Sequence, residues 1–379
     1  MHILYLIPVL FTLVYCILIV YYLYYWKKIQ PPGPTNSGTN PFVSIVIAAR
    51  NEEATIQECI ASCLKQNYPA HLFEVIVVDD QSEDDTYEIL ETIEDPKFVM
   101  MRLGVYKRTT IKGSKKKAIA YGINHAKGEI ICTTDADCIV PENWVLSMVS
   151  YFNHQKIKLV SGPVGIMQSN NFLNYFQALD FSGNGLINAA GLRSKIHHLC
   201  NAANLAYRKH IFLEEDAFEN NYNIPSGDDV FLIHKIKENY PDGIAFAKTT
   251  EAIIKTHALK DWSSFFQQRL RWAGKMSLMK DWSLKWIPTW VWLQRVSIIV
   301  FLILGIFLKD LNLILITGSC WFIYWLADFI LQYDACRFYN IKKWQIWFFP
   351  VALFHSFYFI LIGILSWLPI TSDWKGRRV

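Results

Sequence analysis

The sequence predicts an α/β fold, a Rossmann-like domain with a mostly parallel sheet, accompanied by transmembrane helices. Between residues 41 and 256, β-branched runs alternate with segments whose apolar residues recur at helical spacing, which is typical of a parallel sheet covered by helices. Outside this region, long apolar runs exceed what a buried helix of a soluble protein needs. The composition agrees, because 52% of the residues are hydrophobic and only 18% are charged.

Four strands and three helices are expected to alternate along the α/β region. The strands are predicted at residues 43–49, 73–78, 98–103 and 129–133, and the helices at 53–66, 84–93 and 116–126. Strands joined by helical crossovers run parallel, so their carboxyl ends should meet at one edge of the sheet.

The apolar run in residues 1–28 is predicted to be a retained transmembrane anchor, because it lacks the basic start and small-residue cleavage site of a signal peptide. Lys27 and Lys28 lie at its end, so the positive-inside rule places the α/β region in the cytoplasm. Three further parts are expected: amphipathic interfacial helices at 257–286, about three transmembrane helices at 287–370 and a tail at 371–379.

The basic residues near the C-terminus give conflicting indications of topology. They are Arg337, Lys342 and Lys343 between the last two predicted spans, and Lys375, Arg377 and Arg378 in the tail. The first three agree with a cytoplasmic loop, whereas three C-terminal spans would place the tail outside. Either the rule fails here, or one segment is re-entrant or interfacial. Arg295, within the first of these spans, should face protein or acceptor rather than lipid.

Several classes of site and partner are disfavoured. The net charge is only +4, without a Lys/Arg stripe interleaved with aromatic residues, so nucleic acid is not expected as a partner. The eight cysteines show no paired C-x-x-C spacing for zinc, and Cys59 and Cys63 are expected to pack in the core in a reducing cytoplasm. Residues 48–53 contain no glycine, which excludes a dinucleotide fingerprint or P-loop after the first strand.

Polar residues cluster after three of the predicted strands: Arg50-Asn51-Glu52, Asp79-Asp80 and Asp135-Ala136-Asp137. For any one cluster, capping of the next helix is a simple alternative. Three clusters at one sheet edge instead favour a ligand crevice. The Asp-x-Asp triplet can place two hard carboxylate oxygens near one Mg²⁺ or Mn²⁺, which would bridge the phosphates of a diphosphate ligand.

Seven segments between residues 43 and 272 carry a family resemblance. In order they are V-S-I-V-I-A-A-R-N-E-E, V-I-V-V-D-D-Q-S, K-G-S-K-K-K-A-I-A-Y-G, T-D-A-D, N-A-A-N-L-A-Y-R-K, S-G-D-D and Q-Q-R-L-R-W. Through them the sequence resembles glycosyltransferase family 2, whose catalytic domain has the GT-A fold. The resemblance implies a GT-A domain at residues 41–256.

The resemblance also implies roles for single residues. The donor-binding residues would be Glu52, Asp79, Asp80, Lys115 and Asp135, with the first three near the nucleoside and Lys115 near the diphosphate. Asp137 would be the main ligand of Mg²⁺ or Mn²⁺, and Asp135 would contribute to the metal or the ribose.

On the acceptor side, Asp229 matches the general base, and Asp228, where family members often have Glu, would support it. Helix capping by this pair is the alternative. Gln268, Arg271 and Trp272 match the Q-x-x-R-W motif and would contact the diphosphate and the acceptor. The same residues also fit an amphipathic interfacial helix in an aromatic belt, and both interpretations can hold together.

Other polar residues are expected to take no part in the chemistry. His197 and His198 are interpreted as ordinary polar surface. The basic run at residues 112–117 is interpreted as solvated or attracted to anionic lipid, with only Lys115 matching the family.

The expected activity is therefore inverting, metal-dependent hexosyl transfer from a nucleotide-sugar, a UDP-sugar by preference, to an acceptor delivered at the membrane. A lipid or lipid-linked acceptor is preferred, because about four spans are few for enclosing a polymer channel. A processive polysaccharide synthase remains an alternative, and so does a non-catalytic nucleotide-sugar-binding membrane subunit. The expected location is a bacterial inner membrane with the catalytic domain in the cytoplasm, and the oligomeric state stays open.

Overall fold

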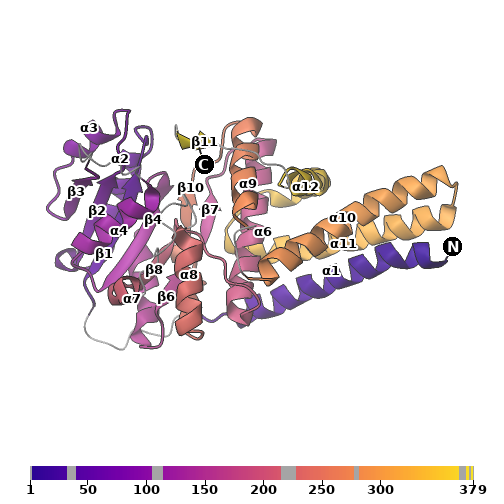
Figure 1. Cartoon of the computed structure of the whole chain (residues 1–379), viewed down its shortest axis with the longest axis horizontal. Coiled ribbons are helices and arrows are strands. Elements are labelled where there is room, and N and C mark those ends of the chain that lie inside the picture. Colours follow the sequence, from indigo (N-terminus) through magenta and orange to yellow (C-terminus); the bar gives the residue numbers. More distant parts are fainter. Residues whose placement is uncertain are drawn as a thin grey trace. The chain divides into compact units, whose positions relative to one another are not determined.

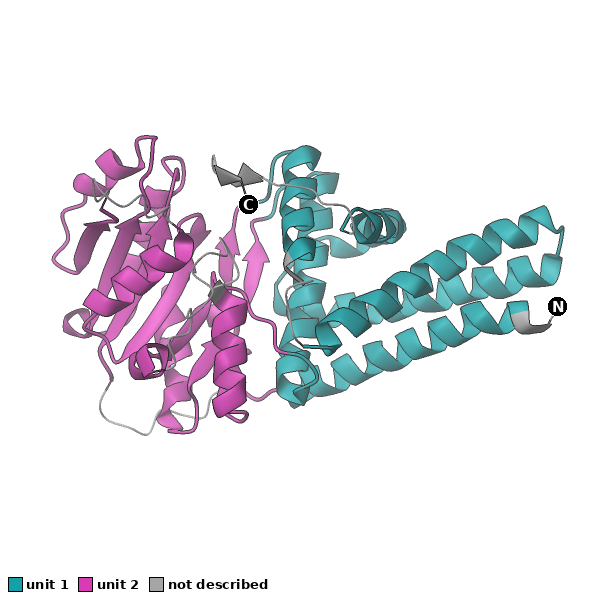
Figure 2. Cartoon of the chain, viewed as in Figure 1, with its two compact units in different colours: residues 1–28, 168–197, 258–379 teal, residues 29–167, 198–257 magenta. Residues whose placement is uncertain are grey.

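The structure is a computed structural model, and it describes residues 2–31, 40–104, 114–214, 228–276, 281–366, 373–374 and 377–378. The chain divides into two compact units, shown in different colours in Figure 2. Unit 1 comprises Met1–Lys28, Gln168–His197 and Ala258–Val379, and unit 2 comprises Ile29–Met167 and His198–His257.

Unit 2 is built on a seven-stranded sheet with the order β3-β2-β1-β4-β8-β6-β9. Its strands are β1 (Val43–Ala49), β2 (Phe73–Asp79), β3 (Phe98–Arg102), β4 (Ile130–Asp135), β6 (Leu159–Ser161), β8 (Leu205–Arg208) and β9 (Ile244–Phe246). The first four in this order run parallel to one another, whereas β8 runs antiparallel to β4 and β6. The predicted mostly parallel α/β sheet is therefore confirmed.

Helices alternate with the parallel strands, as predicted. They are α2 (Ile56–Leu64), α3 (Thr86–Glu91) and α4 (Lys115–His125). β1 and β2 are β-branched and buried almost throughout, which a strand covered on both faces requires. α4 lies against both strands. A Cβ on Gly122 would lie 2.7 Å from Val46 Cγ1, so this helix needs glycine there to approach the sheet.

A second, three-stranded sheet has the order β5-β10-β7. Its strands are β5 (Cys138–Ile139), β7 (Val164–Ile166) and β10 (Ile254–Thr256). Strands of two or three residues carry no detectable alternation of apolar and polar residues, so the sequence pattern did not predict them. The remaining helical elements of unit 2 are η1 (Ala70–Leu72), α5 (Trp144–Val149), η2 (Ser150–Asn153), α7 (Lys209–Glu214), α8 (Asp228–Asn239) and η3 (Thr250–Ala252).

Unit 1 consists mainly of helices (Figure 1). They are α1 (His2–Lys28), α6 (Phe172–Ser194), α9 (Trp262–Met276), α10 (Ser283–Phe307), α11 (Leu311–Phe338) and α12 (Trp344–Leu365), followed by a hairpin of β11 (Asp373–Trp374) and β12 (Arg377–Arg378). Within the described ranges, α1, α10, α11 and α12 are long and apolar enough to cross a membrane.

α1, α10 and α11 lie side by side in Figure 1. At one end, Tyr5 donates a hydrogen bond of 2.8 Å to Asp310. At the other end, the rings of Trp26 and Phe338 lie 5.0 Å apart. α1 therefore follows α11 over nearly its whole length.

α6 belongs to the helical unit, although the predicted GT-A range of residues 41–256 includes it. The rings of Tyr175 and Trp347 stack at 5.0 Å between α6 and α12. Gln332 on α11 donates a 2.9 Å hydrogen bond to the carbonyl of Leu179. The continuous sequence of the predicted domain is thus divided between two compact units, because α6 buries one face against the apolar helices.

Two expectations about exposed polar residues are wrong. His197 and His198 are 3% and 2% exposed, so they are not polar surface. Tyr22 of α1 lies over His197, at 5.7 Å between ring centroids. Lys116 is fully buried, and its ammonium lies 4.2 Å from the ring centroid of Phe231. The buried ammonium is stabilised by a cation–π contact with this ring, because solvent does not reach it.

Candidate active site

The three polar clusters predicted to share one sheet edge do lie there. Ala49 at the end of β1 pairs with Asp79 at the end of β2. On the other side of β1, Ala48 pairs with Asp135 at the end of β4. The register therefore brings together side chains that are far apart in the sequence, at the carboxyl edge where α/β folds bind ligands.

Asp79 and Asp80 are buried at the end of β2. Asp79 Oδ1 accepts a 3.1 Å hydrogen bond from the backbone N–H of Ser82, and its other oxygen lies 3.2 Å from Arg102 Nε. Arg102 also stacks over the ring of Tyr87, at 4.1 Å from its centroid. These contacts order the turn after β2 and balance the Asp79 charge.

The turn after β1 is bound to the turn after β2 through Arg50, which sequence reasoning did not assign a role. Arg50 Nη1 donates to the carbonyl of Asp80 at 3.0 Å, and Nη2 lies 2.9 Å from Glu83 Oε1. Glu52 donates its backbone N–H to Thr86 Oγ1 at 2.7 Å. Asn51 has a positive φ of 52°, a conformation that Asn tolerates better than most residues. The two loops thus form one rigid rim.

Lys115 and Asp135 form an ion pair with Nζ and Oδ1 2.5 Å apart. Lys115 begins α4 and Asp135 ends β4, so the pair lies between a strand end and a helix N-terminus. Both the lysine ammonium and the first turn of a helix attract anions. This side of the rim can therefore hold phosphate groups.

The Asp-x-Asp triplet connects β4 to β5, with Asp135 and Asp137 half-buried around buried Ala136. The Cys138 thiol contacts Asp137 Oδ1 at 3.5 Å. Hard carboxylate oxygens at the ligand edge fit Mg²⁺ or Mn²⁺. Over the described residues, no group of three or more His, Cys, Asp or Glu could hold a metal ion.

His257 is a further candidate that sequence reasoning missed. β10 pairs antiparallel with β5, and Thr256 lies opposite Cys138, so His257 and Asp137 are the residues that adjoin the last pair of this ladder. The imidazole is half-exposed, and its Nε2 lies 3.8 Å from Glu58 Oε2. Imidazole nitrogen is a common metal ligand. The only sequence signal was a histidine after a three-residue strand.

Asp229 lies in the first turn of α8. Its Oδ1 accepts a 2.9 Å hydrogen bond from the backbone N–H of Val230, and its Oδ2 accepts one of 3.3 Å from that of Ala202. These two backbone donors fix the orientation of the carboxylate. The side chain of Asp228 lies outside what the structure describes.

The Q-x-x-R-W residues lie on α9 in unit 1, whereas the sheet edge belongs to unit 2. Gln268, Arg271 and Trp272 are half-buried. The buried member of this segment is Arg269, whose guanidinium lies 4.5 Å from the ring centroid of Trp272. Sequence reasoning gave Arg269 no role.

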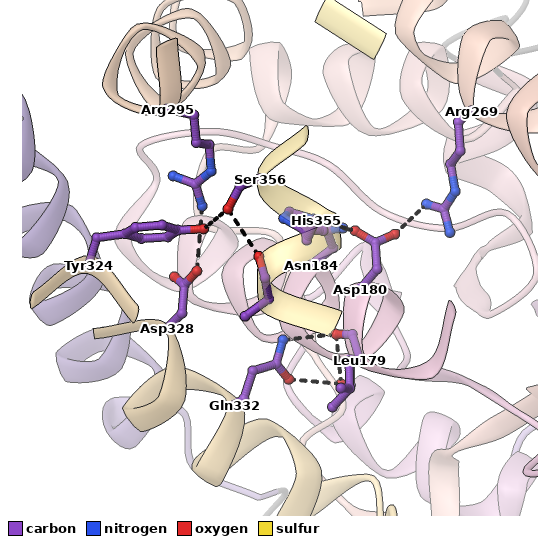
Figure 3. A network of polar contacts seen from close by, with 12 residues as sticks. Leu179, Asp180, Asn184, Arg269, Arg295, Tyr324, Asp328, Gln332, His355 and Ser356 are labelled. Carbon is purple, nitrogen blue, oxygen red and sulfur yellow. Dashed lines mark hydrogen bonds and ion pairs between the residues drawn. The ribbon is translucent and has the colours of Figure 1, made fainter. Parts of the chain in front are cut away.

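Arg269 pairs with Asp180 of α6, at 2.8 Å between Nη1 and Oδ2 (Figure 3). His355 Nε2 lies 3.3 Å from the other oxygen of Asp180, and Asn184 donates to that oxygen at 3.1 Å. Burial by itself would raise the pKa of Asp180, but Arg269, His355 and Asn184 outweigh burial and hold the pKa below its ordinary value.

Figure 3 also shows Arg295 of α10 beside Asp328 of α11. The guanidinium is 3% exposed and lies 3.5 Å from Asp328 Oδ2. Tyr15 of α1 donates a hydrogen bond to Asp328. The expectation that Arg295 faces protein rather than lipid is confirmed.

Comparison with known proteins identifies related sequences. Residues 44–213 match the family model described as glycosyl transferase family 2. Beta-monoglucosyldiacylglycerol synthase from Nostoc sp. is 34% identical over 139 residues, which are 36% of this chain and 27% of that protein. Glycosyltransferase AglE from Haloferax volcanii is 32% identical over 134 residues, or 35% of this chain and 43% of that protein.

A polysaccharide-forming protein is also similar. Poly-beta-1,6-N-acetyl-D-glucosamine synthase from Staphylococcus epidermidis is 27% identical over 144 residues, which are 37% of this chain and 32% of that protein. The matched part of the chain therefore covers 27% to 43% of the length of these curated relatives.

Among solved structures, the mannosyltransferase PcManGT from Pyrobaculum calidifontis, in complex with GDP-Man and Mn²⁺, has a similar fold. The TM-score is 0.54 at 17% sequence identity, and the match covers 96% of this chain and 99% of that one. This likeness concerns the fold, and it confirms the GT-A architecture that the sequence resemblance predicts.

Proposed function

The chain belongs to glycosyl transferase family 2, and from this we propose an inverting, metal-dependent hexosyltransferase that uses a nucleotide-sugar, preferably a UDP-sugar. The observation that carries the proposal is the sheet edge where the Lys115–Asp135 pair, Asp137 and the Asp79-Asp80 turn come together. Cationic and metal-binding groups beside one another suit a sugar linked to a diphosphate.

Donor binding divides into two parts. Glu52, Asp79 and Asp80 would contact the nucleoside from the two loops that follow β1 and β2. Arg50 and Arg102 make these loops rigid. On the other side of β1, Lys115 would hold the diphosphate together with the N-terminus of α4.

Asp137 would be the principal ligand of Mg²⁺ or Mn²⁺, with either Asp135 or the nearby His257 contributing. The bound ion would neutralise the charge that develops on the departing nucleoside diphosphate. The GDP-Man and Mn²⁺ in the mannosyltransferase of similar fold support this combination of donor and metal.

Asp229 would act as the general base and Asp228 would support it. The backbone N–H groups of Val230 and Ala202 hold the Asp229 carboxylate in position. An ionised carboxylate can take the proton from an acceptor hydroxyl as the oxygen attacks the anomeric carbon, and a single displacement inverts that carbon.

The acceptor is proposed to arrive from the membrane. The catalytic GT-A domain at residues 41–256 would be cytoplasmic, at a bacterial inner membrane, with interfacial helices at 257–286 ahead of the apolar segment 287–370. Gln268, Arg271 and Trp272 would contact the acceptor and diphosphate. The similar glycolipid-forming protein supports a lipid acceptor, and the similar poly-N-acetylglucosamine synthase supports the processive alternative.

A donor screen on the purified full chain in lipid tests the proposal. Nucleoside diphosphate release is followed with UDP- and GDP-sugars, with Mg²⁺, Mn²⁺ or chelator, and with several lipid acceptors. We expect release to require metal and to rise with one lipid class. A long polymer formed without added lipid would instead support the polysaccharide synthase.

The Asp229→Asn variant tests the catalytic role directly. We expect it to lose sugar transfer while retaining donor binding, because the amide cannot accept the proton. Full transfer activity in this variant would refute the base assignment. Donor binding by the unaltered chain without release from any donor would favour the non-catalytic subunit.

A further inference from the structure

We propose that α12 lies along the cytoplasmic interface of the membrane and does not cross it. The chain would then have three membrane spans, α1, α10 and α11, and its C-terminus would lie on the same side as residues 41–256. The inference depends on the membrane integration proposed above, but not on the identity of donor or acceptor.

The direction of α12 is the first observation. Figure 1 shows α12 end-on, whereas α1, α10 and α11 run across the view. A helix of 22 residues is about 33 Å long. Among the residues described, its ring and hydrogen-bond contacts with α11 all fall between Tyr324 and Tyr333, which are about 14 Å apart along that helix.

The C-terminal part of α12 then leaves α11 and contacts α10. Trp292 donates a 3.2 Å hydrogen bond to the carbonyl of Ile360, and Arg295 lies over the ring of Phe359. α1, by contrast, contacts α11 from Asp310 to Phe338. α12 therefore crosses the bundle, whereas α1 runs along it.

The contacts of α12 with α10 fall between the start and the middle of α10, at Trp292 and Arg295. The exposed apolar stretch of α10 from Val300 to Phe307 therefore lies beyond α12. The start of α10 is at the end of the bundle at which α1 finishes with Lys27 and Lys28. α12 thus lies against the half of α10 that is nearer these lysines.

The distribution of basic residues agrees with three spans. Lys27, Lys28, Lys285 and Arg337 lie at the same end of α1, α10 and α11, and Lys342 and Lys343 directly precede α12. If α12 crossed the membrane, the basic tail would lie outside, against the positive-inside rule. If α12 stays at the interface, every basic cluster lies inside. The conflict seen in the sequence then disappears.

The two faces of α12 differ in the way that an interfacial position requires. Large exposed apolar side chains recur every three or four residues along one face: Ile346, Phe349, Leu353, Phe357, Leu361 and Ile364. The other face packs on α6 and α9, where His355 meets Asp180. An interfacial helix buries its apolar face at the boundary of headgroups and acyl chains. In α12, the face that water would cover in an isolated interfacial helix is covered by α6 and α9. The opposite face, which carries the exposed apolar stripe, would therefore contact the lipid surface.

Cysteine accessibility in sealed membrane vesicles tests the topology. Single cysteines are placed at exposed positions before and after α12, Lys342→Cys and Ser366→Cys, and between α10 and α11, Lys309→Cys. A membrane-impermeant maleimide is added to vesicles of either orientation, and labelling of the unsubstituted chain supplies the background from the native cysteines. We expect Ser366→Cys to react from the same side as Lys342→Cys, opposite to Lys309→Cys. Reaction of Ser366→Cys from the Lys309 side would overturn the proposal.

A depth measurement gives a second, independent test. Nitroxide labels are placed at Phe357 in the middle of α12 and at Phe322 within α11, both exposed positions. Collision with oxygen is compared with collision with a water-soluble nickel complex. We expect the label on α12 to be shallower than the label on α11. Equal depth at the two positions would show that α12 spans the membrane.

Discussion

Arg269 Nη1 lies 2.8 Å from Asp180 Oδ2, and the two side chains are only 8% and 5% exposed. The pair joins α9 to α6, and His355 extends it to α12. Arg269 also stacks on Trp272 of the same helix. A buried ion pair therefore holds the helix that carries Gln268 and Arg271, although neither of its members belongs to the recognised motif.

Removing one member of this pair should destabilise the protein strongly. Arg269→Met leaves the Asp180 carboxylate buried without its guanidinium, and breaking such a pair costs about 3–5 kcal/mol. The double variant Asp180→Leu with Arg269→Met should recover most of this loss, because it leaves no unpaired charge. Unfolding of the full chain in detergent micelles measures both. Arg193→Met, an exposed arginine of α6, is the matched control and should have little effect. Equal stability of the single and double variants would contradict the expectation.

The lowered pKa of Asp180 predicts a loss of stability in acid. The pKa is lower in the folded chain than the unfolded value of about 3.9, so the stabilisation is complete above that value. It is lost as the pH falls through the lower, folded pKa, because only then does the folded carboxylate take up a proton. Unfolding measured from pH 6 downward should show this decline, and Asp180→Asn should make that part of the profile flatter. An identical acid profile in the variant would assign the decline to other groups.

Lys115→Ala should weaken donor binding by about 10- to 100-fold, because a hydrogen bond to a charged group contributes about 1.5–3 kcal/mol. The loss of affinity should be smaller for a donor with one phosphate between nucleoside and sugar than for a donor with two, since fewer phosphate oxygens are available. Isothermal titration with the donor measures the change. Lys127→Ala removes the same charge from an exposed lysine just beyond the other end of α4 and serves as the control. Equal weakening in the two variants would indicate a general charge effect.

The metal dependence should distinguish Asp137 from His257. Asp137→Ala should abolish activity at any Mn²⁺ concentration, whereas His257→Ala should raise the Mn²⁺ needed for half-maximal activity by roughly 10- to 100-fold, the range found for residues that tune a metal site. Glu58→Gln removes the carboxylate beside His257 but leaves the imidazole, and should change the requirement little. Metal titration of donor hydrolysis gives the three values. An unchanged requirement in His257→Ala would exclude the imidazole as a ligand.

Much of the sheet edge that carries the candidate site could be predicted from sequence, because its strands are long. β1, β2 and β4 are β-branched runs of six or seven residues, and the polar residues directly after them must lie at one edge once the strands are parallel. The position of Asp135 beside Lys115 follows from this arrangement. The rigidity that Arg50 supplies did not follow, since a side chain can bind backbone carbonyls without leaving a pattern in the sequence.

The sequence by itself determined the four parallel strands β1 to β4 and the long apolar helices, because hydrophobic periodicity and length are local properties. Only the tertiary structure decided that β10, which precedes His257, pairs with β5, that Asp180 meets Arg269, and that α12 crosses the other apolar helices. Each of these depends on packing between segments that are distant along the chain. Hydropathy measures how apolar a helix is, but its direction relative to its neighbours depends on the side chains it packs against, here those of α6, α9, α10 and α11.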